Sequence, residues 1–226
     1  MIYIIFLCIV IGFFCYITLH KRWIRLNCVN HLEQMLLDTT NLLEKHAINY
    51  WLDYGTLLGA YRSKSMSLHE FDVDLSIEAS DIAKLIEFMK NLQPGYYLNN
   101  PPRGDLSKWV KNKIKIRHKK MWGSIDIYIY YPFHNQTLCQ SKACVLENEI
   151  ILDCKPNKEF LQLNYDVTFP LKTTQMTVAG QSKTYNIPNQ TLKYLNMLYG
   201  TNLTPDFYGI LGNRFFIKKL FRKTRG

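Results

Sequence analysis

The sequence has no internal repeat and no low-complexity segment, which excludes a repeat architecture. Its 226 residues also lack the length for a second full domain. A hydrophobic content of 47%, with 14% aromatic residues, excludes the disordered class of proteins. We therefore expect one globular domain with a proper core, which we assign to residues 23–212.

Acidic residues are scarce relative to basic ones, because 18 Asp and Glu face 28 Lys and Arg and give a net charge of +10. The excess is concentrated at residues 21–25, 103–120 and 218–225, so the rest of the chain is net negative. Local contacts to anions fit this distribution better than a continuous track for nucleic acid. We expect no nucleic-acid partner, and we treat residues 213–226 as a basic C-terminal tail.

Charge is absent from residues 2–19, an apolar run near the lower limit for spanning a bilayer. The run lacks the basic start and the small-residue cleavage site of a signal peptide. It predicts an N-terminal transmembrane helix that, with its flank, occupies residues 1–22 and makes the membrane a partner.

The orientation of this span rests on two opposing signals. Lys21, Arg22 and Arg25 follow it, and the positive-inside rule would place that side in the cytoplasm. Glycosylation sequons at Asn135 and Asn189, and a third at residue 202, are meaningful only on the other side. We predict a single-pass, type II membrane protein with its catalytic domain in the Golgi or ER lumen.

Four of the six cysteines lie outside the apolar run. Cys139 and Cys144 bracket a predicted hairpin loop, and a disulfide between them is the pairing that a lumenal domain would favour. Buried free thiols are the alternative.

Two neighbouring acids dominate the segment from Trp51 to Ile77. A strand over 71–77 points its apolar residues one way and Asp72 and Asp74 the other. Adjacent buried carboxylates repel each other, and a divalent metal ion is the simplest relief. The alternative is an exposed edge strand with solvated acids.

Two further strands carry charged side chains on one face. Residues 122–131 alternate so that Asp126 lies opposite the isoleucines, and its natural partner is whatever Asp72 and Asp74 hold. In the strand before it, Lys113 and Lys115 share one face. That face suits a diphosphate or an anionic glycan, or it is a solvated edge that deters aggregation.

A strand that ends at Tyr54 is followed by Gly55, Thr56 and a short helix over 57–62. The free N–H groups at the start of such a helix can hold a phosphate. This turn and three acids on two strands form the layout of the nucleotidyltransferase fold. The sequence therefore predicts an α+β fold in which helices flank a nucleotidyltransferase-like mixed β-sheet.

Within that fold, the chain resembles the LicD family, which includes bacterial phosphocholine transferases, fukutin and fukutin-related protein. The motif DYGTLLGAYR at 53–62 and the acid cluster HEFDVDLSI at 69–77 carry the resemblance. The strand SIDIYIY, the segment FPL…VAG…YNIP and the ending LKYLNMLYG…P extend it to Pro205.

The resemblance implies a phosphotransferase that moves phosphocholine, ribitol phosphate or a similar group from a CDP-linked donor to a glycan or glycoprotein hydroxyl. It implies that Asp72, Asp74 and Asp126 are catalytic residues and ligands of Mg²⁺ or Mn²⁺. Gly55, Thr56 and Arg62 would contact the donor phosphates. Family members often have an aspartate where this chain has Glu70, so we count Glu70 as a possible further metal ligand.

In the mechanism that follows, Asp126 accepts the proton of an acceptor hydroxyl, which attacks the donor phosphorus while CMP leaves. One alternative is a nucleotidyltransferase acting on RNA or a small molecule. Another is a non-catalytic, membrane-tethered glycan-binding protein that keeps the fold.

Overall fold

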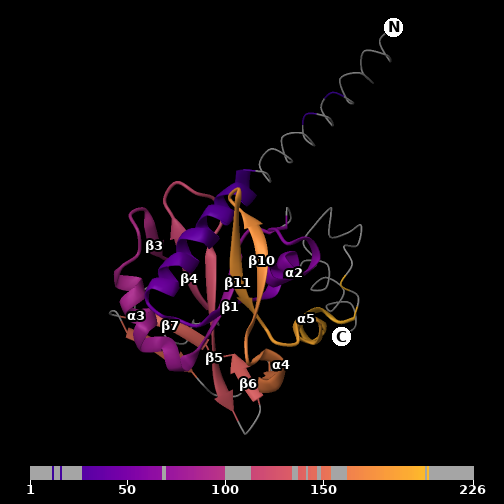
Figure 1. Ribbon diagram of the computed structural model, residues 1–226. Helices are drawn as coiled ribbons and strands as arrows, with labels where there is room; N and C mark the ends of the chain where they lie inside the picture. Colours follow the sequence, from indigo (N-terminus) through magenta and orange to yellow (C-terminus); the bar gives the residue numbers. More distant parts are fainter. Residues whose placement is uncertain are drawn as a thin grey trace, which may run out of the picture.

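The computed structural model describes residues 12, 16, 27–67, 70–99, 113–133, 137–140, 142–146, 149–153, 162–201 and 203 (Figure 1). The predicted span over residues 2–19 lies outside these residues, except for Gly12 and Tyr16. The basic tail lies outside them as well. In the part of the chain that is described, every helix is too short or too polar to cross a bilayer.

A seven-stranded mixed sheet forms the centre of the domain, with the order β1-β2-β5-β4-β3; β6 pairs with β5 and β9. Strands β2 and β5 are parallel, and the neighbouring pairs are antiparallel. The strands are β1 (Tyr50–Leu52), β2 (Val73–Glu78), β3 (Tyr96–Leu98), β4 (Lys113–His118), β5 (Ile125–Phe133), β6 (Thr137–Gln140) and β9 (Gln162–Asn164).

The register of β2 against β5 decides which side chains meet. Val73 lies opposite Ile125, and Asp74 lies opposite Asp126. Because strands alternate their side chains, the apolar residues of both strands share one face and the acids share the other. The predicted alternation is confirmed from Val73 on, since Val73, Leu75 and Ile127 are fully buried. The strand begins two residues later than predicted, and Phe71 before it is exposed.

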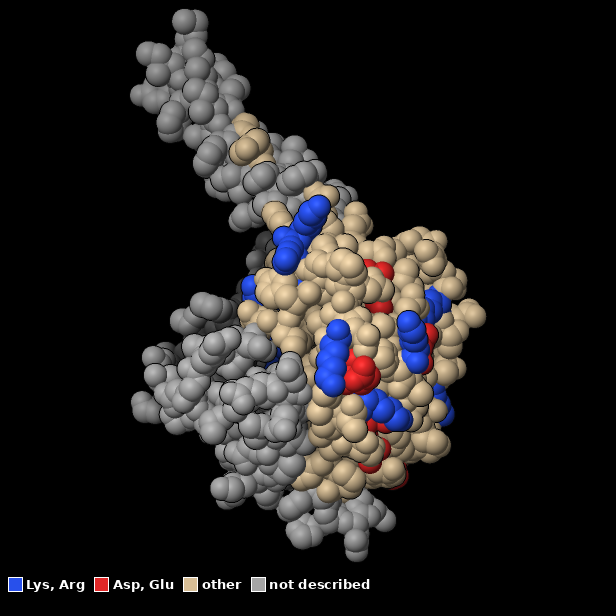
Figure 2. All heavy atoms as spheres, turned by 90° about the vertical axis from the view of Figure 1, so that its left-hand side faces the viewer, with Lys and Arg blue, Asp and Glu red and all other residues tan. Residues whose placement is uncertain are grey.

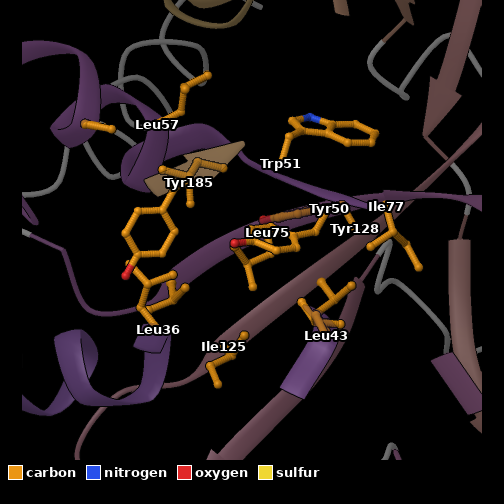
Figure 3. Packing of buried hydrophobic residues seen from close by; sticks show 14 of the residues in the cluster. Leu36, Leu43, Tyr50, Trp51, Leu57, Leu75, Ile77, Ile125, Tyr128 and Tyr185 are labelled. Atoms are coloured by element: carbon orange, nitrogen blue, oxygen red, sulfur yellow. The ribbon is translucent and has the colours of Figure 1, made fainter. Parts of the chain in front are cut away.

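One face of the sheet is covered by the helix over 27–45, which crosses it in Figure 1. Leu36 and Leu43 of this helix pack in the same core as Leu75 and Ile77 (Figure 3). Tyr50 projects from β1 toward the helix and donates a hydrogen bond to Glu44 at 2.8 Å. The short η1 (Ala79–Asp81) and α3 (Ile82–Lys90) complete this side.

The opposite face carries α2 (Tyr54–Ser63), α4 (Tyr165–Thr168) and α5 (Thr191–Tyr199). Trp51, the neighbour of Tyr50, points to this side and donates to the hydroxyl of Tyr194 at 3.1 Å. Two hairpins lie outside the main sheet: β7 (Lys142–Leu146) with β8 (Glu149–Asp153), and β10 (Lys172–Val178) with β11 (Gln181–Ile187). The predicted mixed sheet flanked by helices is confirmed.

The predicted disulfide is wrong. Cys139 is a buried free thiol, so it forms no disulfide with Cys144; it sits on β6, whose backbone is paired on both sides. Asp81 precedes α3 but does not cap it through its side chain. Its carboxylate instead accepts hydrogen bonds from the backbone of Asn49 at 2.9 Å and from Lys84 at 2.7 Å.

Surface charge is mixed on the face shown in Figure 2. Lys and Arg side chains lie singly over the described surface, several of them next to Asp or Glu, without forming a continuous basic track there. The acids of β2 and β5, in contrast, gather at one point of the sheet.

Candidate active site

Three carboxylates lie together where β2 begins. Glu70, Asp72 and Asp74 each offer an oxygen atom, and these atoms all lie within 4.8 Å of one another. Asp74 is 5% exposed, whereas Glu70 and Asp72 are half-buried. The bend before β2 brings Glu70 back over the acids of the strand, so the structure brings all three together.

The start of α2 holds Asp74 in place. The Gly55 backbone N–H donates to the Asp74 carboxylate at 3.1 Å, and the Thr56 hydroxyl accepts from the Asp74 backbone N–H at 2.8 Å. The positive end of the helix thus points at a carboxylate of the chain itself. Gly55 and Thr56, predicted to contact the donor, both contact Asp74 here.

The approach of Glu70 leaves no room for a Cβ atom at position 55 unless the glutamate side chain moves. A Cβ atom built on Gly55 would overlap the carboxylate of Glu70. Because glycine lacks this atom, the carboxylate can rest against the first turn of α2. The Gly55 position and the Glu70 position therefore depend on each other.

Arg62, at the last turn of α2, is exposed and lies on the Glu70 side of the site. Its guanidinium donates to the carbonyl of Leu203 and acts on Glu70 through its charge, in the direction that lowers the pKa of Glu70. Arg62, the third residue predicted to contact the donor phosphates, thus lies beside the acid cluster and is hydrogen-bonded to the segment that follows α5.

Asp126 occupies the neighbouring position on β5 and is fully buried. Its carboxylate lies against Asp72 and is ion-paired with Lys113 and with Lys115, the latter at 2.8 Å. The structure brings Asp126 to the cluster but covers it with two ammonium groups. A hydroxyl could contact it only after these lysines moved.

Burial and mutual repulsion make the ionised acids costly. Burial, then the charges of Asp72 and Asp126, raise the pKa of Asp74 well above its usual range. Burial, then the charge of Asp126, raise the pKa of Asp72. Burial and Asp72 raise the pKa of Glu70 to about 7, against the opposing effect of Arg62.

These donors fit a hard divalent cation. Mg²⁺ and Mn²⁺ prefer carboxylate oxygens, and a cation among three crowded carboxylates would relieve both their burial and their repulsion. Glu70, Asp72 and Asp74 are the residues that could hold it. Asp126 faces the same point but already has two cationic partners.

One buried acid was not singled out from the sequence. Asp53 follows β1, is fully buried, and caps α2 by accepting from the Tyr54 backbone N–H at 2.7 Å. Its other oxygen accepts from Ser76 at 2.5 Å and from Tyr130 at 3.4 Å. Burial raises the pKa of Asp53 to about 6, although these hydrogen bonds oppose the shift. Its place before the Gly-Thr turn was the available signal.

Aromatic side chains form part of the same wall. Tyr128 of β5 donates to Asp74 at 3.3 Å, and its ring lies 4.7 Å from the ring of Tyr54. Tyr54 in turn accepts a hydrogen bond from Gln140 at 3.2 Å. The alternation of β5 predicts that Tyr128 shares a face with Asp126. Its contact with Asp74 on β2 depends on the register of the two strands, which the sequence does not give.

Comparison with known proteins points to one family. A family model described as "LicD/FKTN/FKRP, nucleotidyltransferase domain" matches residues 47–189. The human protein named ribitol 5-phosphate transferase FKRP is 34% identical over 187 residues, which are 80% of this chain and 33% of that protein. An uncharacterized protein from Rickettsia prowazekii (strain Madrid E) is 32% identical over 108 residues, 46% of this chain and 41% of the relative.

The chain therefore spans less than half the length of these curated relatives. The family match includes β1, α2, β2 and β5, the elements that carry the acid cluster and its supports.

Proposed function

The chain belongs to the LicD/FKTN/FKRP family, and we propose that it transfers a phosphate-linked group from a CDP-activated donor to a hydroxyl of a glycan, releasing CMP. The transferred group would be phosphocholine, ribitol phosphate or a similar group. The observation that carries the proposal is the cluster of Glu70, Asp72 and Asp74, held against the first turn of α2.

Glu70, Asp72 and Asp74 are the ligands that we propose for Mg²⁺ or Mn²⁺. When bound, such a cation neutralises charge on phosphate oxygens and on the leaving group. The chain's own part is to fix these ligands: Gly55 and Thr56 anchor Asp74, and Tyr128 donates to it. Direct contact of Arg62 with donor phosphates is part of the proposal, whereas Gly55 and Thr56, predicted for the same contact, would act on the donor through Asp74.

The reaction forms one bond from the acceptor hydroxyl oxygen to phosphorus and breaks the bond from that phosphorus to the CMP oxygen. The hydroxyl proton must pass to a base, and the sequence predicts Asp126 for this role. Its full burial beneath Lys113 and Lys115 argues for an indirect role instead. The proton would then pass to one of the half-buried carboxylates of the cluster, Glu70 or Asp72.

The proposal is tested by incubating the purified chain with a panel of CDP-linked donors, a glycan acceptor and Mn²⁺ or Mg²⁺, and measuring CMP. Asp72→Asn and Asp74→Asn keep the side-chain shape but remove a ligand charge, and we expect CMP release to fall by at least about 100-fold, the scale of losing one transition-state contact. Asp166→Asn, an exposed residue on α4, is the matched control.

Three outcomes would reject the proposal. Unchanged turnover in Asp72→Asn and Asp74→Asn would exclude the cluster as the catalytic site. Incorporation of a nucleotide into RNA or a small molecule would favour a nucleotidyltransferase. Cation binding with no CMP release from any donor would favour a non-catalytic glycan-binding protein.

We also propose that residues 2–19 anchor the chain in a membrane as a type II protein with a lumenal catalytic domain. The apolar run and the sequons support this location. The side-chain amide of Asn189 donates to the carbonyls of Asp166 and Phe169 at 3.4 and 3.3 Å, so a glycan on this nitrogen would displace at least one of these hydrogen bonds. Protease protection of the chain in intact microsomes, lost on adding detergent, is the expected result.

A further inference from the structure

Two lysines of β4 point toward the acid cluster rather than into solvent. Lys113 and Lys115 alternate with the buried Ile114 and Ile116, and they lie opposite Tyr128 and Asp126 in the register. Their side chains are only 23% and 16% exposed. The strand is also paired on both sides, with β3 and β5. A solvated edge strand, the alternative reading of this segment, is therefore excluded.

Each ammonium group is held by fixed partners. Lys113 is ion-paired with Asp126 and donates to the Tyr128 hydroxyl at 3.2 Å. Lys115 lies 2.8 Å from the other Asp126 oxygen and donates to Ser124 at 2.9 Å. The two ammonium groups thus converge on one carboxylate, which holds them side by side.

This pairing supplies more positive charge than Asp126 needs. One ammonium neutralises one carboxylate, and burying a second ammonium costs free energy unless another anion compensates it. Lys113 also interacts through its charge with Asp74 and Asp72, so the pair borders the proposed cation site. Once a divalent cation neutralises Asp72 and Asp74, these carboxylates no longer compensate the second ammonium. A further anion bound beside them would then take their place.

A diphosphate meets these requirements. It carries several negative charges on closely spaced oxygens, and lysine binds phosphate as a point charge with three donors. An anionic glycan would bring isolated charges on a larger body, which two converging ammonium groups suit less well. A diphosphate bound to these two lysines would lie on the Asp126 side of the cluster. The Glu70 side would then be available to other ligands.

We propose that Lys113 and Lys115 bind the diphosphate of the CDP-linked donor, and that Asp126 is a positioning residue that holds both ammonium groups at the site. This inference rests on the proposed function. It assigns Asp126 a role through the lysines, in place of direct contact with the acceptor hydroxyl.

The test measures binding of CDP to the full chain of residues 1–226 by calorimetry with saturating Mn²⁺. Lys113→Met and Lys115→Met keep the apolar stem and remove the charge. Each should weaken CDP binding by roughly 10- to 100-fold, the scale of one hydrogen bond to a charged group. Lys119→Met removes an exposed lysine just beyond β4 and should leave CDP affinity unchanged.

A second variant separates binding from folding. Losing both lysines would leave Asp126 buried and unpaired, so the triple variant Lys113→Met, Lys115→Met, Asp126→Asn restores neutrality. We expect it to fold, bind Mn²⁺ and lose CDP binding. Asp126→Asn alone should weaken CDP binding while Mn²⁺ affinity stays within about threefold.

The outcomes distinguish the two proposals. If the wild-type chain binds no CDP with Mn²⁺ present, the proposed function fails and takes this inference with it. If the wild-type chain binds CDP and the lysine variants bind it equally well, the lysine assignment alone is overturned. A large loss of Mn²⁺ affinity in Asp126→Asn, with CDP binding intact, would overturn the positioning role and make Asp126 a metal ligand.

Discussion

The buried carboxylate of Asp53 should make the stability of the domain depend on pH. Its pKa is raised from 3.8 to about 6, chiefly by burial. A carboxyl group whose pKa is higher in the folded state binds more protons there, so its favourable contribution is complete below the unfolded pKa. That contribution is lost as the pH rises through about 6.

The size of the effect follows from the shift. Roughly two pKa units at about 1.4 kcal/mol each give on the order of 3 kcal/mol between pH 4 and pH 8. Asp53 has no exposed surface, so solvent does not screen this term. For a domain of this size, the difference amounts to about 6–12 °C in Tm.

Asp53→Asn removes the charge and can keep the cap, because the amide oxygen can accept from the Tyr54 backbone N–H. The amide nitrogen can then donate to Ser76, whose hydroxyl also accepts hydrogen bonds. We expect the free energy of unfolding of the wild-type chain, relative to Asp53→Asn, to fall by about 3 kcal/mol between pH 4 and pH 8.

Urea denaturation at several pH values, in EDTA so that cations do not contribute, measures this difference. Asp166→Asn, which changes an exposed carboxylate, is the control and should run parallel to the wild-type chain. If the wild-type and Asp53→Asn curves also run parallel between pH 4 and pH 8, the reasoning from burial is refuted.

Three other substitutions test the supports of the cluster. In EDTA, Asp74→Asn should be at least as stable as the wild-type chain. Mn²⁺ at 100 times its Kd should raise the free energy of unfolding of the wild-type chain by roughly 2.7 kcal/mol, measured by thermal unfolding, and Asp74→Asn should lack this gain. Thr56→Val leaves the Asp74 backbone N–H without its acceptor and should cost about 1–3 kcal/mol in urea denaturation, whereas Thr56→Ser should cost less. Gly55→Ala should displace Glu70 and weaken Mn²⁺ binding by about tenfold, roughly one lost carboxylate contact. Its stability in EDTA should change little. Equal Mn²⁺ affinity in this variant and the wild-type chain would exclude Glu70 as a ligand.

The alternating strands could be predicted because their pattern is local. A period of two places Asp74 on one face of β2, with Asp72 just before the strand, and Asp126 on one face of β5, without knowledge of the fold. The same rule put Lys113 and Lys115 together. Which of these faces meet depends on the order and register of β2, β5 and β4, and such pairing joins residues distant in sequence.

The partners of the helix turn could not be predicted for a related reason. The sequence indicates that the backbone N–H groups before Leu57 can bind an anion. An internal carboxylate and a ligand phosphate both satisfy these groups, and the sequence does not distinguish them. In the fold, Asp74 lies beside Gly55 and takes that place. Asp53 was not predicted because a capping aspartate is usually solvated. In the fold, Ser76 of β2, Tyr130 of β5 and Tyr194 of α5 enclose its carboxylate.

The charges of the site explain why cation and donor should bind together. When all of them are ionised, as a bound cation favours, its four carboxylates outnumber its side-chain cations by one among the described residues. The carboxylates are those of Glu70, Asp72, Asp74 and Asp126, and the cations are Arg62, Lys113 and Lys115. A site with this balance repels a diphosphate, and one divalent cation reverses its sign. The lysines make this reversal possible with a single ion, because they already compensate Asp126. Cation and donor are then coupled through charge, without any movement of the sheet that carries them.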